Sequence, residues 1–235
     1  MSISTYTTDS QSYSSDTMVL TNHLGAVDVS PKALHPSVNS KIKRLIDIVG
    51  AVIGLIITTI AAIPVAIAMC ISDPGPILYS QIRCGLNGKP FRIWKFRSMV
   101  VGADKIKHLV KNQAQGHIFK AVDDPRITPV GKFLRSSSLD EFPQFWNVLI
   151  GDMSLVGTRP PTPDEVKNYS PHHWERLRVK PGMTGEWQTH GRSKITDFET
   201  IVKMDLDYQH KWSIVYDLKL IWKTIWVVLK KSGAC

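Results

Sequence analysis

Two adjacent carboxylates, Asp140 and Glu141, are the residues of this sequence whose types and spacing most strongly indicate chemistry. They stand in Ser-Ser-Ser-Leu-Asp-Glu-Phe-Pro-Gln-Phe-Trp-Asn, residues 136–147, just before a proline and an apolar run. An aspartate can attack phosphorus directly and form a covalent phosphoryl intermediate. Carboxylate oxygens also suit Mg²⁺, which prefers hard ligands. The pair is therefore a candidate reaction centre for phosphoryl groups.

Basic residues gather around this pair. They are Arg126, Lys132 and Arg135 before it, Arg159 after it, and Lys95 and Arg97 in an upstream segment. His172 and His173 with Glu175 lack the i, i+4 spacing of a helical zinc pair. Carboxylates among arginines, without zinc ligands, indicate Mg²⁺ and phosphate groups rather than zinc chemistry.

The pair also has a purely structural interpretation. Ser138 could cap a helix, with Glu141 reaching back to it in a capping box. Pro143 would then fall at the fifth helical position, where it removes a hydrogen bond and collides with the preceding turn. A helix that begins at Pro143 is more comfortable and leaves the acids in its lead-in. On these residues alone, capping and catalysis both remain open.

A long apolar segment must position this chemistry at a membrane. Residues 48–71 contain no charged residue, and as a straight helix they would rise about 36 Å, enough to cross a hydrocarbon core of roughly 30 Å. Basic residues flank both ends, and Pro64 lies two-thirds of the way along, which favours a re-entrant helix that breaks at Pro64. A tilted or kinked full span is the alternative.

Composition divides the remaining chain. The 235 residues carry a net charge of +9, whereas residues 1–40 hold three aspartates and one lysine among many Ser and Thr. We expect a disordered polar tail over 1–40, a membrane helix over 41–73, and a catalytic domain over 74–235. The basic body requires an anionic partner. Three cysteines without metal-type spacing favour a reducing compartment.

Further elements give an α+β fold class. Residues 77–99 alternate with period two around Asn87-Gly88, which predicts a β-hairpin. Helices are expected near 195–210 and 213–231. The last one, with Trp222, Trp226 and several lysines, fits a helix at a membrane interface, and equally a core helix with a lysine-lined outer face.

Three ordered motifs resemble one family. "RCGLNGKPFRIWKFRSM", "DPRITPVGKFLRSSSLDEFPQFWNVLIGDMSLVGTRP" and "KPGMTGEWQTHGR" are similar to those of the bacterial sugar transferases, the polyprenyl-phosphate hexose-1-phosphate transferases also called monotopic phosphoglycosyl transferases. The resemblance covers about residues 41–233 and matches the minimal catalytic form. It implies transfer of a hexose-1-phosphate from a UDP-sugar to undecaprenyl phosphate, with release of UMP, as the first membrane step of exopolysaccharide or glycoconjugate synthesis.

The same resemblance implies roles for individual residues. Asp140 matches the nucleophile that forms an aspartyl-phosphosugar, and Glu141 its partner, tied to Mg²⁺. Asp205 matches a further functional acid, expected at the metal. The family's basic positions, expected to bind phosphates and nucleotide, are occupied by Lys95, Arg97, Arg135, Arg159 and Arg192.

For topology, the resemblance implies a re-entrant helix broken at Pro64, on the cytoplasmic face of the bacterial inner membrane, with membrane lipids as partners. Ile63, Thr158 and Phe142 depart from the serine, proline and leucine usual there. We expect no nucleic-acid partner, since no nucleic-acid module is recognisable, and a homo-oligomer stays open. The alternative function is a membrane-anchored basic protein that binds nucleic acid or anionic lipid.

Overall fold

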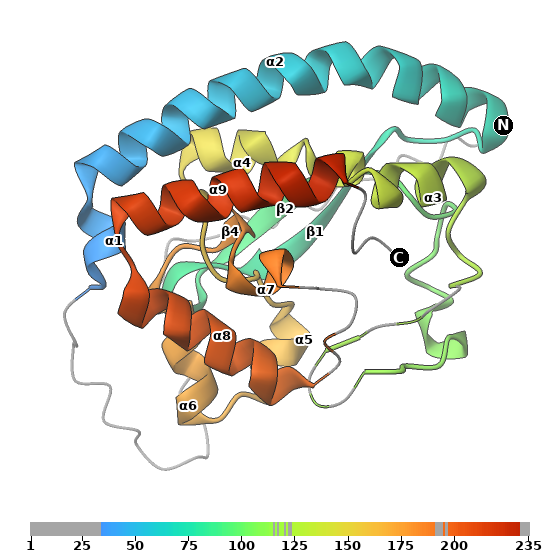
Figure 1. Ribbon diagram of the computed structural model, residues 1–235. Coiled ribbons are helices and arrows are strands. Elements are labelled where there is room, and N and C mark those ends of the chain that lie inside the picture. The colour runs from blue at the N-terminus through green and yellow to red at the C-terminus, as the bar shows by residue number, and fades with distance from the viewer. Residues whose placement is uncertain are drawn as a thin grey trace, which may run out of the picture. The chain divides into compact units, whose positions relative to one another are not determined.

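The computed structural model describes residues 34–114, 116, 118–119, 121, 124–190, 195 and 197–230, apart from the side chains of Lys107 and Leu229 (Figure 1). Its α-helices and strands are α1 (Pro36–Asn39), α2 (Lys41–Ser72), β1 (Leu78–Cys84), β2 (Pro90–Phe96), α3 (Pro129–Ser136), α4 (Gln144–Ile150), β3 (Ser154–Val156), α5 (Pro163–Val166), α6 (Pro171–Trp174), β4 (Gly182–Thr184), α7 (Glu186–Thr189), α8 (Phe198–Lys211) and α9 (Ile214–Leu229). The short 3₁₀ turns are η1 (Leu86–Gly88), η2 (Lys107–Leu109), η3 (Leu139–Glu141) and η4 (Glu175–Arg178). Helices dominate and two small sheets accompany them, so the α+β class is confirmed.

The predicted hairpin is confirmed. Strands β1 and β2 pair antiparallel, with Tyr79 opposite Lys95 and Cys84 opposite Pro90. Asn87 and Gly88 in the turn have φ angles of 53° and 77°, the left-handed region that Asn and Gly tolerate best. A second sheet, which the sequence did not reveal, is a short parallel pair of β3 and β4.

Helix α2 differs in part from its prediction. It is long and apolar enough to cross a membrane, and it begins and ends within one residue of the expected 41–73. The predicted break at Pro64 is wrong for this structure, because the helix continues through that residue to Ser72. Instead α2 follows an arc (Figure 1), and this curvature accommodates the proline without ending the helix.

One face of α2 packs on the rest of the chain. Its buried residues recur at helical spacing and are Lys43, Asp47, Ala51, Gly54, Val65 and Met69. A β-carbon at Gly54 would lie 2.4 Å from the Phe145 ring, so this glycine permits the close approach of α2 to α4. The opposite face exposes a row of isoleucines, including Ile56, Ile60 and Ile67, which are 59%, 68% and 57% exposed. An apolar face of this size indicates contact with lipid or protein.

Both ends of α2 are fastened to the same body. Near its start, the Lys43 ammonium lies 2.5 Å from the Asp217 carboxylate of α9, and both side chains are buried. Arg44 donates hydrogen bonds to the carbonyls of Val148 and Leu149 at the end of α4. At its far end, the capping residue Asp73 forms an ion pair with Arg97, just beyond β2.

The exposed face of α9 is apolar. Val215, Leu218, Trp222, Ile225 and Trp226 are all exposed, whereas Asp217 and Leu220 are buried. A core helix would show the reverse pattern, so the interpretation as a core helix with a lysine-lined outer face is wrong. Tryptophan beside lysine on an apolar face is typical of a helix at a membrane interface.

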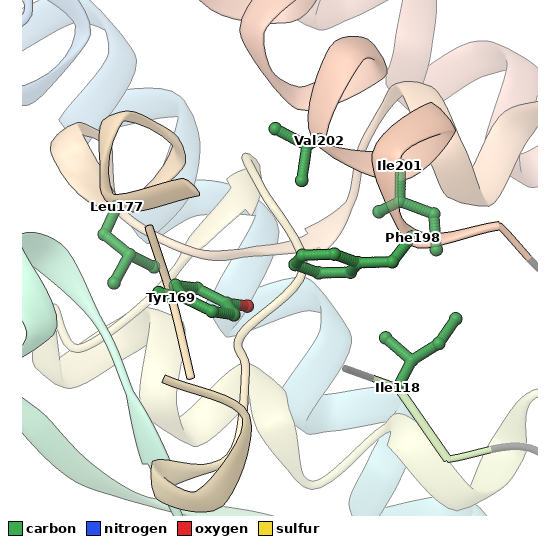
Figure 2. Packing of buried hydrophobic residues seen from close by; sticks show 6 residues of the cluster. All are labelled: Ile118, Tyr169, Leu177, Phe198, Ile201 and Val202. Atoms are coloured by element: carbon green, nitrogen blue, oxygen red, sulfur yellow. The ribbon is translucent and has the colours of Figure 1, made fainter. Parts of the chain in front are cut away.

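The largest apolar cluster among the described residues lies where α8 meets Ile118, Tyr169 and Leu177. Figure 2 shows its buried members Ile118, Tyr169, Leu177, Phe198, Ile201 and Val202. Phe198 and Ile201 come from the first turn of α8, and Tyr169 faces Phe198 at 5.5 Å between ring centroids. This cluster holds α8 against the part of the chain that contains Tyr169 and Leu177.

The boundary of the predicted tail shifts. Residues 1–33 of the expected tail lie outside the described residues, whereas residues 34–40 include α1. The His35 ring contacts the Gln209 carbonyl at 3.0 Å, and Ser37 is buried. Residues 34–40 are therefore packed on the rest of the described chain.

Candidate active site

A cavity of about 520 Å³ lies between the β1–β2 hairpin, the start of the next loop and η3. Its wall includes both candidate acids and four of the five predicted cations: Asp140, Glu141, Lys95, Arg97, Arg135 and Arg159. Arg192, the fifth cation, lies outside the described residues. Residues up to 64 positions apart in the sequence thus meet at one site, as the phosphate hypothesis requires.

Local backbone geometry presents the acids to this cavity. Asp140 and Glu141 form the 3₁₀ turn η3, and α4 begins directly after Pro143. Ser138 precedes them with φ 58° and ψ 14° and makes no side-chain capping hydrogen bond, so the capping-box interpretation is wrong. A left-handed serine is uncommon, and such strain is found preferentially at functional sites.

Asn147 ties η3 and α4 to the hairpin. This fully buried residue accepts a hydrogen bond from the Trp94 backbone amide at 3.2 Å and donates one to the Arg92 carbonyl at 2.7 Å. The Asn147 side chain thereby pairs with backbone groups of β2 that a neighbouring strand would otherwise bind. The sequence reasoning missed Asn147, because nothing in its spacing distinguishes a buried amide from a solvated one.

Glu141 forms an ion pair with Lys95. The Lys95 ammonium lies 2.9 Å from its carboxylate, and about a quarter to a third of each side chain is exposed, 26% and 30%. The neighbouring Asp140 is buried, with 8% of its surface exposed. The two acids therefore occupy different environments, which suits them to separate roles.

The predicted cations have different partners. Arg97 donates hydrogen bonds to Asp73 and to the carbonyls of Pro76 and Met99, so it holds the end of α2 to the loop beside the cavity. Arg135 donates to the Ser98 hydroxyl at 2.9 Å. Arg97 is thus occupied by structural contacts, whereas Arg135 forms no ion pair within the described ranges.

Arg159 is the most firmly supported cation. Its guanidinium donates to both oxygens of Glu165, at 3.0 and 3.3 Å, and lies 5.9 Å from the Trp187 ring centroid. Burial alone would raise the pKa of Glu165, but the charge and hydrogen bonds of Arg159, with the charge of Arg83 and the Thr162 amide, together outweigh burial and lower it. This carboxylate therefore stays ionised and fixes Arg159.

Asp205 lies away from the cavity lining. It is 1% exposed, and its carboxylate accepts two hydrogen bonds from Arg176, which is itself fully buried. Arg176 also contacts Tyr169 and, at 3.4 Å, the carbonyl of Arg159. Asp205 is thus absent from the cavity lining that holds Glu141, and its hydrogen bonds connect it to the site through Arg176.

The carboxylates of the cavity can bind Mg²⁺ only if substrate phosphates supply further ligands. Across the described residues, no group of three His, Cys, Asp or Glu side chains could hold a metal ion. Asp140 and Glu141 nevertheless supply adjacent carboxylates in one cavity wall. Mg²⁺ is commonly held by one or two carboxylates together with substrate phosphates, so the residues present fit that mode.

The sequence did not indicate three charged residues of the cavity wall, Arg83, Asp104 and Glu165. The strand register could have revealed Arg83: side chains two apart share a face, so Arg83 lies on the face of Tyr79, whose cross-strand partner is Lys95. Glu165 follows Thr162 in a capping box, a pattern that gives no hint of its bonds to Arg159.

Comparisons with known proteins agree with this arrangement. The profile of the family described as "Bacterial sugar transferase" matches residues 38–231. The chain is 55% identical over 194 residues to "Galactosyl transferase CpsE" of Streptococcus agalactiae, covering 82% of this chain and 43% of that protein. It is 41% identical over 196 residues to the "UDP-glucose:undecaprenyl-phosphate glucose-1-phosphate transferase" of Escherichia coli, covering 80% of this chain and 40% of that protein.

A third relative is of similar length. The "Exopolysaccharide production protein ExoY" of Sinorhizobium fredii is 37% identical over 198 residues, covering 82% of this chain and 87% of the relative. By contrast, the chain spans about two fifths of the two relatives above, 43% and 40%. On the match over residues 38–231, this chain belongs to the bacterial sugar transferase family.

Proposed function

We propose that this protein is a phosphoglycosyl transferase that moves a hexose-1-phosphate from a UDP-sugar to undecaprenyl phosphate, at the start of exopolysaccharide or glycoconjugate synthesis. The observation that supports this most is the placement of Asp140 and Glu141 in a cavity wall beside Lys95 and Arg135. Family membership and the relatives' names support the same class of reaction.

The reaction proceeds in two displacements. The Asp140 carboxylate attacks the phosphorus bonded to the sugar, and the bond from that phosphorus to the UMP oxygen breaks, so UMP leaves with the electron pair. An oxygen of undecaprenyl phosphate then attacks the same phosphorus and releases Asp140. Each step conserves the phosphorus–sugar bond.

The other residues act on charge and orientation. Lys95 neutralises Glu141 and lies near the transferred group, while Arg135 and Arg159 face the diphosphate. Mg²⁺, held by Glu141 with Asp140, would supply charge neutralisation for the leaving UMP. Asp205 orients Arg159 through Arg176 and is not part of this metal site.

The membrane arrangement that we propose is re-entrant. Arg44 at one end of α2 and Asp73 at the other are bound to α4 and to the residue that follows β2. A helix of 32 residues would reach about 48 Å if it projected straight across a bilayer, which would carry one end away from those partners. Both ends therefore stay on the cytoplasmic side, with the isoleucine face of α2 in lipid.

The alternative function, a basic protein that binds nucleic acid or anionic lipid, gives the acidic pair no role. The ion pairs of Lys95, Arg97 and Arg159 also neutralise much of the basic surface at the cavity. Membership of the transferase family makes the enzyme the better explanation.

The test is release of UMP by the purified full chain in detergent with Mg²⁺ and undecaprenyl phosphate, supplied in turn with UDP-glucose, UDP-galactose and their N-acetylated forms. We expect release with at least one donor, and a fall of roughly 10³-fold or more in Asp140→Asn, because the amide is a poor nucleophile. Asp164→Asn, at a highly exposed carboxylate, is the matched control and keeps the wild-type rate. Wild-type turnover by Asp140→Asn would refute the nucleophile.

A further inference from the structure

Arg83 is a basic cavity residue to which neither the motifs nor the mechanism above gives a role. It is the penultimate residue of β1, and its side chain contributes to the same wall as Asp140 and Glu141. Its Nε donates to Gln81 Oε1 at 3.1 Å, and its Nη1 donates to the Pro160 carbonyl at 3.0 Å. These two contacts hold the guanidinium in place beside Arg159 while using two of its five N–H donors.

The contacts of Arg83 differ from those of its neighbours. Lys95, Arg97 and Arg159 each pair with a carboxylate, from Glu141, Asp73 and Glu165 respectively. Arg83 forms no ion pair with any residue in the described part of the chain. A fixed, partly buried guanidinium with unused N–H groups suits bidentate recognition of a phosphate oxygen pair.

The electrostatic surroundings of Arg83 place it between cationic and anionic parts of the site. Burial, and after it the charge of Arg159, lower the pKa of Arg83 to about 10, although Glu165, Tyr79 and Glu141 act in the opposite direction. Arg83 thus remains charged at neutral pH. Two neighbouring guanidinium groups repel each other, and a doubly charged anion between them would relieve that repulsion.

We propose that Arg83 is a substrate-binding residue that grips the diphosphate of a nucleoside diphosphate sugar, together with the neighbouring Arg159 in the same cavity wall. The identification of the ligand as a nucleoside diphosphate rests on the proposed function. The anion site itself rests on the contacts of Arg83.

Calorimetry on the full chain in detergent tests the proposal with UDP and with inorganic pyrophosphate, and saturation-transfer NMR follows uridine. Arg83→Gln should weaken UDP and pyrophosphate roughly tenfold or more, since a charge-assisted bidentate contact is lost, and should leave uridine binding unchanged. Arg83→Lys, which keeps the charge without the planar fork, should lose less. Arg92→Gln is the matched control on the same hairpin, at an exposed residue outside the cavity, and should match wild type.

Two results would overturn the proposal. One is pyrophosphate affinity in Arg83→Gln equal to that of wild type. The other is a parallel loss of UDP and uridine, which would indicate that Arg83 only supports the fold. Failure of the proposed function looks different: the wild-type protein would release no UMP from any donor, while pyrophosphate binding would still depend on Arg83.

Discussion

Asp205 shows how a single buried charge can support a site without touching it. Its carboxylate binds Arg176, and Arg176 reaches the backbone of Arg159, whose side chain lines the cavity. Both charges lie in the interior, 1% exposed or less. Such a pair requires both members, because removal of one leaves the other charged and unsolvated.

We therefore expect Asp205→Asn to destabilise the protein by about 3–5 kcal/mol. Its melting temperature should fall in thermal denaturation followed by circular dichroism, and the Mg²⁺ concentration for half-maximal UMP release should not change. Asp207→Asn, two residues along α8 and half-exposed, is the control and should melt like wild type. A variant that melts normally but needs more Mg²⁺ would restore Asp205 as a metal ligand.

For individual residues, the sequence indicated which side chains line the cavity better than it indicated which residues they bind. Asp140, Glu141, Lys95, Arg135 and Arg159 all line the cavity as expected. The spacing of charges along the chain could not show that Arg97 is bound to Asp73, or that Arg83 and Glu165 complete the wall. Those contacts depend on where separate elements meet.

Among the elements, α2 and α4 meet at a point with no space for a side chain. Gly54 faces the ring of Phe145, and Thr58, one turn later on α2, donates a long hydrogen bond of 3.3 Å to the Phe142 carbonyl next to the acidic turn. Helix α2 therefore contacts the segment that carries the candidate nucleophile. A displacement of α2 should therefore change the position of η3.

Gly54→Val should lower stability by about 1–3 kcal/mol, because the new side chain overpacks the junction of α2 and α4. UMP release should fall with it, measured at a temperature where the variant remains folded. The matched change Ile53→Val, on the exposed face of the same helix, should leave both unchanged. Equal melting temperatures for Gly54→Val and wild type would contradict this packing.

Elements with local signals were predictable from sequence. The hairpin follows from alternation around Asn87-Gly88, and α2 from its length without charge. The continuity of α2 through Pro64 could not be predicted, because tertiary packing of Val65 and Met69 beyond the proline supports the helix there. The parallel pairing of β3 with β4 involves segments of three residues each, too short for a periodic signal.

For the whole molecule, the apolar faces of α2 and α9 must be reconciled with a basic, polar body. The buried pair of Lys43 and Asp217 joins these two helices, and Tyr208 and Trp212 also donate hydrogen bonds to Asp217. Fixed in this way, α9 stays against the start of α2, while Arg97 holds the other end of α2 beside the cavity.

This arrangement predicts that both ends of the apolar helix are cytoplasmic. In a variant lacking native cysteines, Lys41→Cys, at the exposed first residue of α2, and Lys111→Cys, at an exposed residue beyond its end, should both resist an impermeant maleimide added to intact cells. Both should react once the inner membrane is opened, which serves as the control for accessibility. Labelling of only one of the two in intact cells would establish a full span.

The central claim is that Asp140 becomes covalently bonded to a phosphorylated sugar, and intact-protein mass spectrometry tests it most directly. Wild-type enzyme incubated with Mg²⁺ and its preferred UDP-sugar, in the absence of undecaprenyl phosphate, should gain the mass of one hexose phosphate, which peptide mapping places on Asp140. Asp140→Asn should gain none, and later addition of the lipid phosphate should discharge the adduct from wild type. Product that accumulates normally while no adduct forms would contradict the account.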